Sequence, residues 1–228
     1  MSNWSSEPRC STIRKETVSV ADVLTDRHPL PPLDGDDLAL RPWSPARILS
    51  ATAWSEESLA RLVAALGVER PNDGRRAQAA PQGRVWWTAP RRALVIAETS
   101  DAPSLGEGEG WVMQAETGAH VGFRVAGGTA RRLLARLVPI DLAEAVFPID
   151  AFATTRADGV LVHVQRRIAE AAPEGDGFDL MVARSQGRFF AEILVDAATA
   201  FGVTVPDEMR RGTAARRLSS REVFGPSR

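Results

Sequence analysis

Hydrophobic and polar residues follow a regular order only in the middle of the chain, over residues 46–203. In some stretches apolar residues alternate with polar ones, which is the pattern of a half-buried strand. In others apolar residues recur three and four positions apart, which is the pattern of an amphipathic helix. The two patterns follow one another along the chain, so we predict an α+β domain over residues 46–203.

The first half of this domain begins with a predicted strand at Arg47–Trp54. A helix follows, because Ser55 can cap it and Glu56 and Glu57 are favourable at its positive end. Gly67 ends this helix, since glycine readily adopts the left-handed conformation that closes a helix. Three more strands are predicted, at Arg84–Thr88, Ala93–Glu98 and Trp111–Glu116.

The second half repeats this order. It starts with a strand at His120–Ala126 and a short helix that Thr129 opens. A hairpin turns at Asp158-Gly159, a dipeptide that tolerates positive φ, and joins strands at Ala151–Arg156 and Gly159–Arg166. A strand at Phe178–Ala183 and a helix from Gln186 to Phe201, capped by Ser185 and closed by Gly202, complete it. The repeated order predicts two related sheet-and-helix lobes.

Both ends of the chain lack this periodicity. Residues 1–45 are polar and rich in proline, so we predict an irregular arm or linker there. Its Asp34, Asp36 and Asp37 are similar to the start of a calcium loop, but the other ligands of such a loop are missing and a solvated linker is the better interpretation. Residues 204–228 are rich in arginine and serine, and we predict a basic tail.

Composition and charge exclude several classes of function. The 228 residues carry a formal net charge of −1, so no long-range field favours nucleic acid or an anionic membrane. Apolar runs such as Ala93–Ala97 are too short to cross a bilayer, and Met1–Arg9 does not resemble a secretory signal. With a single cysteine, Cys10, no disulfide can form within the chain. We therefore expect a cytoplasmic protein that binds neither nucleic acid nor membrane.

Catalytic and metal-binding patterns are missing from the sequence. The three histidines are His28 in the arm and His120 and His163 in predicted strands, where a histidine is usually part of the sheet. None of them is spaced with a second histidine or a carboxylate as a ligand pair, and no nucleophile elbow occurs. We predict that the chain holds no catalytic, cofactor-binding or metal-binding residue.

The segment Val125–Arg131 joins a strand to a helix through Gly127 and Gly128, a position where proteins can bind phosphate. It lacks both the glycine spacing of a dinucleotide site and the lysine of a phosphate-binding loop. The alternative is that the two glycines let the strand turn tightly into the helix.

Trp86 and Trp87 are adjacent in a predicted strand. Successive side chains of a strand point to opposite faces, so one tryptophan can enter the core. The other must be covered by a second layer of this chain or by another protein.

Several stretches together resemble the gamma subunit of the heterotetrameric sarcosine oxidases. The resemblance covers Arg47 to Gly202, although Gly127-Gly128 stands where members of that family usually have Gly-Pro. The stretches that carry it are Arg47–Trp54 (RILSATAW), Trp86-Trp87, His120–Asp141 (HVGFRVAGGTARRLLARLVPID), Phe147-Pro148 with the following hairpin, and Phe178–Gly202 (FDLMVARSQGRFFAEILVDAATAFG).

The resemblance implies an α+β fold like that of the folate-binding aminomethyltransferases and a non-catalytic role in sarcosine catabolism, a part of one-carbon metabolism. In related heterotetrameric complexes a large (alpha) and a flavin (beta) subunit oxidatively demethylate sarcosine to glycine. Those two subunits hold FAD, covalently attached FMN, NAD and tetrahydrofolate, and the small (delta) subunit carries zinc. The resemblance therefore implies these three partners and no cofactor on this chain.

The sequence leaves three alternatives open. The chain can belong to an N-methylglutamate dehydrogenase-type complex, since similar chains occur there. It can be a stand-alone folate-dependent one-carbon carrier protein, although we identify no acidic residue for a pterin ring. It can also be an adaptor of unrelated function, because a fold does not determine function.

Overall fold

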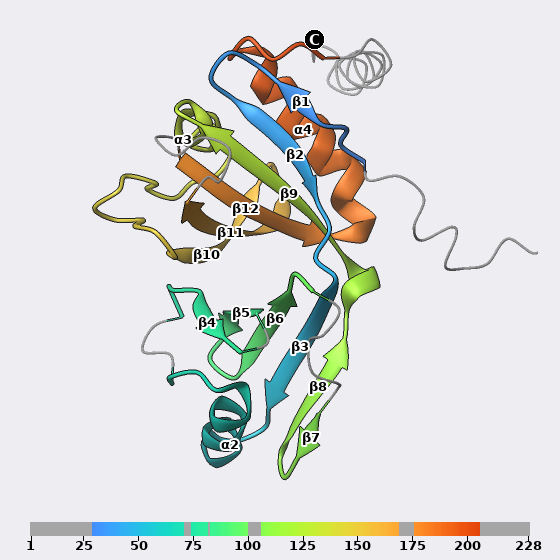
Figure 1. Cartoon of the computed structure of the whole chain (residues 1–228), viewed down its shortest axis with the longest axis vertical. Helices are drawn as coiled ribbons and strands as arrows, with labels where there is room; N and C mark the ends of the chain where they lie inside the picture. Colours follow the sequence, from blue (N-terminus) through green and yellow to red (C-terminus); the bar gives the residue numbers. More distant parts are fainter. Residues whose placement is uncertain (1–28, 71–73, 82, 100–105, 169–175, 206–228) are drawn as a thin grey trace, which may run out of the picture.

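A computed structural model describes residues 29–70, 74–81, 83–99, 106–168 and 176–205. They form two six-stranded antiparallel sheets with few helices, an α+β fold (Figure 1). One, the β9 sheet, has the order β1 (Leu33–Asp34), β2 (Ala39–Trp43), β9 (His120–Gly127), β12 (Asp176–Ala183), β11 (Val160–Ile168), β10 (Phe152–Ala157). The other, the β3 sheet, has the order β4 (Gln78–Ala80), β5 (Gly83–Ala89), β6 (Arg92–Ala97), β3 (Arg47–Ala53), β8 (Trp111–Ala115), β7 (Glu107–Gly108).

The chain passes twice between the sheets, from β2 to β3 and back from β8 to β9 (Figure 1). The two crossings lie side by side, because the amide of Glu116 donates to the carbonyl of Ile48 and the amide of Ile48 donates to the hydroxyl of Thr117. After each of the central strands β3 and β9 come a helix and then strands that return beside it. The predicted pair of sheet-and-helix lobes is therefore confirmed.

The β3 sheet is covered on its outer face by α2 (Glu56–Leu66). Ser55 caps this helix and forms a reciprocal capping box with Ser58, and Gly67 ends it at φ 67°. Both ends are as predicted, because the residues that fix them act locally. The buried side chains of the helix pack on alternate residues of β3, β5 and β6, a cluster that contains Leu59, Leu62, Leu66, Leu49, Ala51, Val85, Trp87 and Val95.

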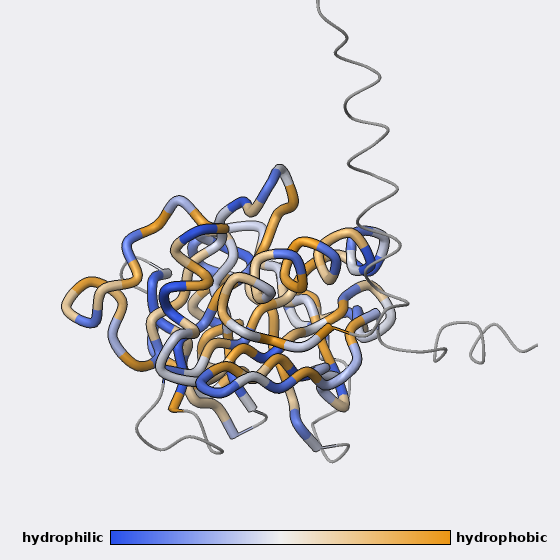
Figure 2. Tube along the Cα trace, turned by 90° about the horizontal axis from the view of Figure 1, so that it is seen from above, coloured by the Kyte–Doolittle hydropathy of each residue, from blue (hydrophilic) through white to orange (hydrophobic). Residues whose placement is uncertain are grey.

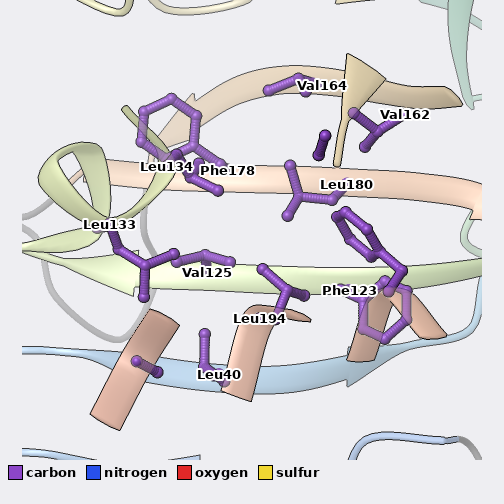
Figure 3. Packing of buried hydrophobic residues seen from close by; sticks show 14 of the residues in the cluster. Leu40, Phe123, Val125, Leu133, Leu134, Val162, Val164, Phe178, Leu180 and Leu194 are labelled. Atoms are coloured by element: carbon purple, nitrogen blue, oxygen red, sulfur yellow. The ribbon is translucent and has the colours of Figure 1, made fainter. Parts of the chain in front are cut away.

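The β9 sheet is covered on its outer face by α3 (Ala130–Leu134) and α4 (Gly187–Thr199). Figure 3 shows the core between them, where alternate residues of four strands meet Leu133, Leu134 and Leu194 of the helices. The same short-range alternation of hydrophobic and hydrophilic residues is visible along the trace in Figure 2. The strand residues labelled in this core are Leu40, Phe123, Val125, Val162, Val164, Phe178 and Leu180.

The start of α4 differs from the prediction. Ser185 does not cap this helix, because it lies within a short 3₁₀ helix at Arg184–Gln186, and Gln186 precedes α4 without a side-chain cap. Gly202 follows the helix with φ 78°, as a closing glycine requires.

The prediction of an irregular arm up to residue 45 is wrong for residues 29–45. They form β1 and β2, and β2 pairs with β9 along its whole length. Leu30, Leu33, Leu38 and Leu40 are buried in the core of the β9 sheet. Their apolar side chains are separated by prolines, glycine and aspartates, which concealed the strand pattern. At the other end Val205 is buried in the same core, so it does not belong to a tail; residues 1–28 and 206–228 lie outside the described residues.

The two tryptophans of β5 point to opposite faces, as predicted, and this chain covers both. Trp87 lies under α2, whereas Trp86 lies between the two sheets against Trp43 and Phe152. Their exposed fractions are 3% and 0%, so the covering layer is the second sheet and not a partner protein.

We expect Trp86→Ala and Trp87→Ala each to lower the free energy of unfolding by about 3–5 kcal/mol, because each removes a buried ring. Trp54→Ala is the matched control, since Trp54 is 63% exposed, and we expect its melting temperature to match the wild type. Thermal melting of the three variants checks this. A wild-type melting curve for either buried variant would contradict this packing of the two rings.

Candidate functional site

The facing surfaces of the two sheets carry residues in three bands. Along each strand, every second residue points to the opposite sheet, and its character changes from charged through apolar to small and polar. On β5 the sequence of these residues is Arg84, Trp86 and Thr88, and on β9 it is Arg124, Gly122 and His120. The bands of the two sheets meet, so the space between the sheets holds a charged cluster, an apolar centre and a polar cleft.

The apolar centre joins the sheets directly. Trp86 of β5 stacks on Phe152 of β10 with 5.2 Å between the ring centroids, and its indole nitrogen donates to Oε1 of Gln165 at 2.7 Å. Trp43 packs on Gly122, where an added Cβ would lie 2.6 Å from the Trp43 ring. A side chain at position 122 would therefore displace Trp43 and open the centre. The remaining members are Ile48, Ala77, Leu94, Ile96 and Met181.

The charged cluster is organised around Asp179 of β12, whose side chain is fully buried. Its Oδ1 accepts from Nε of Arg124 at 3.0 Å and from Nη1 of Arg167 at 3.4 Å, both within the β9 sheet. Its Oδ2 lies 3.3 Å from Nη1 of Arg84, which belongs to the β3 sheet. Three arginines from both sheets therefore surround one buried carboxylate.

Glu98, which follows β6, completes this cluster from the β3 sheet. Its Oε1 accepts from Nη2 of Arg84 at 2.9 Å and from Nη2 of Arg124 at 2.8 Å. The indole nitrogen of Trp43 donates to the same carboxylate at 3.2 Å. Arg84 and Arg124 thus each contact two carboxylates, Asp179 of the β9 sheet and Glu98 of the β3 sheet. Their charges are neutralised in full only when the sheets dock.

A second ion-pair group fixes α3 to the β9 sheet. Arg131 donates to both carboxylate oxygens of Asp176 at 2.7 and 2.8 Å, and Nη2 of Arg166 lies 2.9 Å from Asp176. The bonds from Arg131 hold the pKa of Asp176 below its ordinary value, and they raise the pKa of Arg131. This pairing stabilises the fold above the ordinary pKa of an aspartate, and the stabilisation is lost as the pH falls through the lowered pKa of Asp176.

The glycine turn before α3 is occupied by a carboxylate of this chain. The amide of Gly128 donates to Oδ1 of Asp37 at 2.8 Å, and the hydroxyl of Thr129 donates to the Asp37 carbonyl. Gly127 has φ 123°, and an added Cβ would lie 2.3 Å from the same carbonyl oxygen. These contacts support the second of the two interpretations of Gly127 and Gly128, a tight turn from strand to helix. They also give Asp37 a structural role in place of the solvated linker predicted for it.

The polar cleft lies at the far end of the apolar centre and has a volume of about 440 Å³. Its floor is the β3 sheet, which contributes Ser50 and Thr52 of β3 and Arg92 of β6. Its wall is the β9 sheet, which contributes Thr154 of β10 and both described histidines. A second cavity of about 440 Å³ lies nearby and shares Thr88 and Thr154 with the cleft, but aliphatic and aromatic side chains form much of its lining.

Both described histidines, which the sequence places in separate strands, line this one cleft. His120 begins β9 and His163 lies in β11, with β12 between them, and both point toward the β3 sheet. Among the described residues no group of three or more histidines, cysteines and acidic residues could hold a metal ion. The cleft can therefore offer hydrogen bonds and a few charges.

His163 is 8% exposed, and its Nδ1 lies 2.9 Å from the hydroxyl of Thr154. Burial and, to a smaller extent, the charge of the neighbouring His120 together lower the pKa of His163 from 6.5 to about 4. The ring is therefore neutral at pH 7. It acts as a directional hydrogen-bonding group and not as a cation.

No sequence motif marks the hydroxyl residues of the cleft, Ser50 and Thr52. Ser50 and Thr52 alternate with Leu49, Ala51 and Ala53, so they read as the outer face of a strand with one buried side. The one sign in the sequence is that this face of β3 carries small hydroxyl residues and no charge, since Arg47 lies on the opposite face with Leu49. Such a face is typical of a strand that a second layer approaches closely.

Comparison with known proteins supports the fold. No family model matches the chain, and no curated protein matches it. In a comparison with solved structures, a chain of the heterotetrameric sarcosine oxidase from Corynebacterium sp. U-96, in complex with pyrrole 2-carboxylate, is similar over 77% of this chain and 91% of that chain, with 19% identity and a TM-score of 0.60.

This chain therefore has the fold of a chain of a heterotetrameric sarcosine oxidase. Aminomethyltransferase T of the glycine cleavage system from Bartonella henselae is also similar, with 17% identity over 70% of this chain and 45% of that chain and a TM-score of 0.49. The α+β fold class predicted from the sequence is confirmed. No helix in the described ranges is long and apolar enough to span a membrane.

The buried histidine makes stability depend on pH in a defined window. Because the pKa of His163 is about 4 in the folded protein and 6.5 when unfolded, the unfolded chain takes up a proton first as the pH falls. We expect the free energy of unfolding to drop by about 3 kcal/mol between pH 6.5 and pH 4 because of this residue. Urea unfolding at several pH values measures it.

His163→Gln is the test variant, since glutamine keeps a polar side chain that does not titrate. Its free energy of unfolding should fall less over the same window, whatever its value at pH 7. The ion pair of Asp176 is present in both proteins, so its contribution at the acid end of the window cancels when the two curves are compared. Parallel pH curves for the two proteins would show that His163 is not buried in a neutral state.

Proposed function

We propose that this chain is a non-catalytic, gamma-type subunit of a flavoprotein complex that oxidatively demethylates sarcosine to glycine. The observation that carries the proposal is the structural similarity to a chain of a heterotetrameric sarcosine oxidase, which covers 91% of that chain. A match over nearly the whole of the other chain indicates that the two are built to the same plan, and not that they share one common motif.

The packing between the two sheets fits a structural, non-catalytic role for this chain. The centre of this space is filled by large side chains, among them Trp43, Trp86 and Phe152, and one end is closed by the ion pairs of Asp179. These residues bind the two sheets to each other. What remains open is a polar cleft of about 440 Å³. A stable two-lobed unit of this kind suits a subunit whose outer surface contacts other proteins.

In this proposal the reaction takes place on partner subunits. A large subunit and a flavin subunit hold FAD, FMN, NAD and tetrahydrofolate, and a small subunit carries zinc. The redox chemistry comes from these cofactors, while this chain contributes to assembly of the heterotetramer. The complex works in sarcosine catabolism, in the cytoplasm.

Affinity purification of the tagged chain from its native cell tests the proposal. We expect larger subunits to co-purify in fixed ratio, with the visible absorption of bound flavin and with sarcosine-dependent reduction of an electron acceptor. The same chain produced alone should be colourless. A chain that purifies without partners, or one that binds flavin stoichiometrically when alone, would contradict the proposal.

The same purified material separates the alternatives. A complex that oxidises N-methylglutamate and not sarcosine indicates a dehydrogenase of that type. A lone chain that binds tetrahydrofolate indicates a one-carbon carrier protein. Each of these results replaces the proposed substrate or role with another.

A further inference from the structure

The polar cleft has more hydrogen-bonding groups than its own contacts use. Among the described residues, the side chains of Ser50, Thr52, Gln114 and Arg92 line the cleft and have no hydrogen-bond or ion-pair partner. His163, although 92% buried, uses only Nδ1, and its other ring nitrogen has no partner in this part of the chain. These polar atoms are open to the cavity and to solvent, since Arg92 and Gln114 are exposed and the buried atoms without a partner in the described residues, Nε of Arg166 and Oδ2 of Asp179, lie outside the cleft. A cavity toward which several uncommitted polar groups converge is the usual form of a small-molecule site.

The charges of the cleft restrict what that ligand can be. Arg92 stands opposite Thr52 at one end of the floor, and Glu116 bonds through its amide to Ile48 at the other end. Arg92 and Glu116 carry the permanent charges of the lining, Nδ1 of His120 lies 3.9 Å from the Glu116 carboxylate, and His163 is neutral at pH 7. A strongly charged anion such as a phosphate ester would find one arginine and a nearby carboxylate.

We propose that the cleft binds a small organic monocarboxylate that carries hydroxyl groups. The guanidinium of Arg92 offers two parallel N–H donors, which match a carboxylate. The hydroxyls of Ser50 and Thr52 and the amide of Gln114 follow along the floor and pair with hydroxyl groups of the ligand. Two more hydrogen-bonding groups face the ligand: the Glu116 carboxylate at the opposite end of the floor, and the free ring nitrogen of His163 on the wall.

This inference is independent of the proposed function, because it concerns a site on this chain alone. A ligand in the cleft would contact both sheets, since Arg92 and Ser50 belong to the β3 sheet and His163 and Thr154 to the β9 sheet. Its binding would therefore stabilise the docking of the two sheets and raise the melting temperature.

The three histidines make a site-resolved experiment possible. In full-length protein labelled with ¹⁵N in the imidazole rings and carrying no tag, the ring signals of His120 and His163 report on the cleft. The probe is gluconate, a polyhydroxylated monocarboxylate. Its matched controls are sorbitol, which lacks the carboxylate, and hexanoate, which lacks the hydroxyls. We expect saturable shifts of the His163 ring signal with gluconate, and much weaker binding of both controls.

Two neighbouring arginines provide the matched variants. Arg92 lines the cleft, whereas Arg91 is also exposed but donates to the carbonyl of Trp54 outside it. We expect Arg92→Gln to weaken gluconate binding about tenfold, because one charge-assisted pair is lost, and Arg91→Gln to leave it unchanged.

Three results would overturn the proposal. Gluconate can fail to shift the His163 signal at all, which excludes the ligand class. Both arginine variants can weaken binding equally, which indicates a general surface charge effect. Inorganic phosphate can bind as tightly as gluconate with the same dependence on Arg92, which shows that the cleft recognises charge and not a hydroxylated carboxylate.

Discussion

The arrangement of the two sheets depends on the buried carboxylate of Asp179. A carboxylate that is removed from water costs several kcal/mol unless cations and hydrogen bonds replace its hydration. Arg124 and Arg167 supply part of this from the same sheet, but Oδ2 faces Arg84 of the opposite sheet. Oδ2 of Asp179 accepts no hydrogen bond, so the charge of Arg84, which reaches it only when the two sheets are docked, is its compensation. Glu98 keeps Arg84 and Arg124 in place from the other side.

Once the charged end is fixed, strand geometry determines the rest of the space between the sheets. Along β5, steps of two residues lead from Arg84 in the charged cluster to Trp86 in the apolar centre and then to Thr88 in the polar cleft. Along β6 the same direction leads from Glu98 through Ile96 to Arg92. The tryptophans and Phe152 set the separation of the sheets, which leaves room at the far end where the side chains are short. The cleft thus follows from the same register that closes the opposite end.

Much of this fold could be predicted from the sequence where local chemistry is strong. The α2 helix has its capping serine and its closing glycine, and β9 and β12 alternate clearly. β2 was missed because Leu38 and Leu40 lie among aspartates and Pro42, and its role as a strand comes from pairing with β9, eighty residues later in the chain. The cleft could not be predicted for the same reason: Ser50, Arg92 and His163 carry no motif, and His163 meets the other two only when the sheets dock.

A double-mutant cycle between Asp179 and Arg84 tests most directly whether ion pairing couples the sheets. Free energies of unfolding are measured for Asp179→Asn, Arg84→Gln and the double variant, and Arg61, which pairs with the exposed Glu57 on α2, serves as the control position. We expect a coupling free energy of about 1–3 kcal/mol for Asp179 with Arg84 and none for Asp179 with Arg61. Additive effects of Asp179→Asn and Arg84→Gln would show that the sheets dock without this interaction, which would contradict the central role of the Asp179 carboxylate.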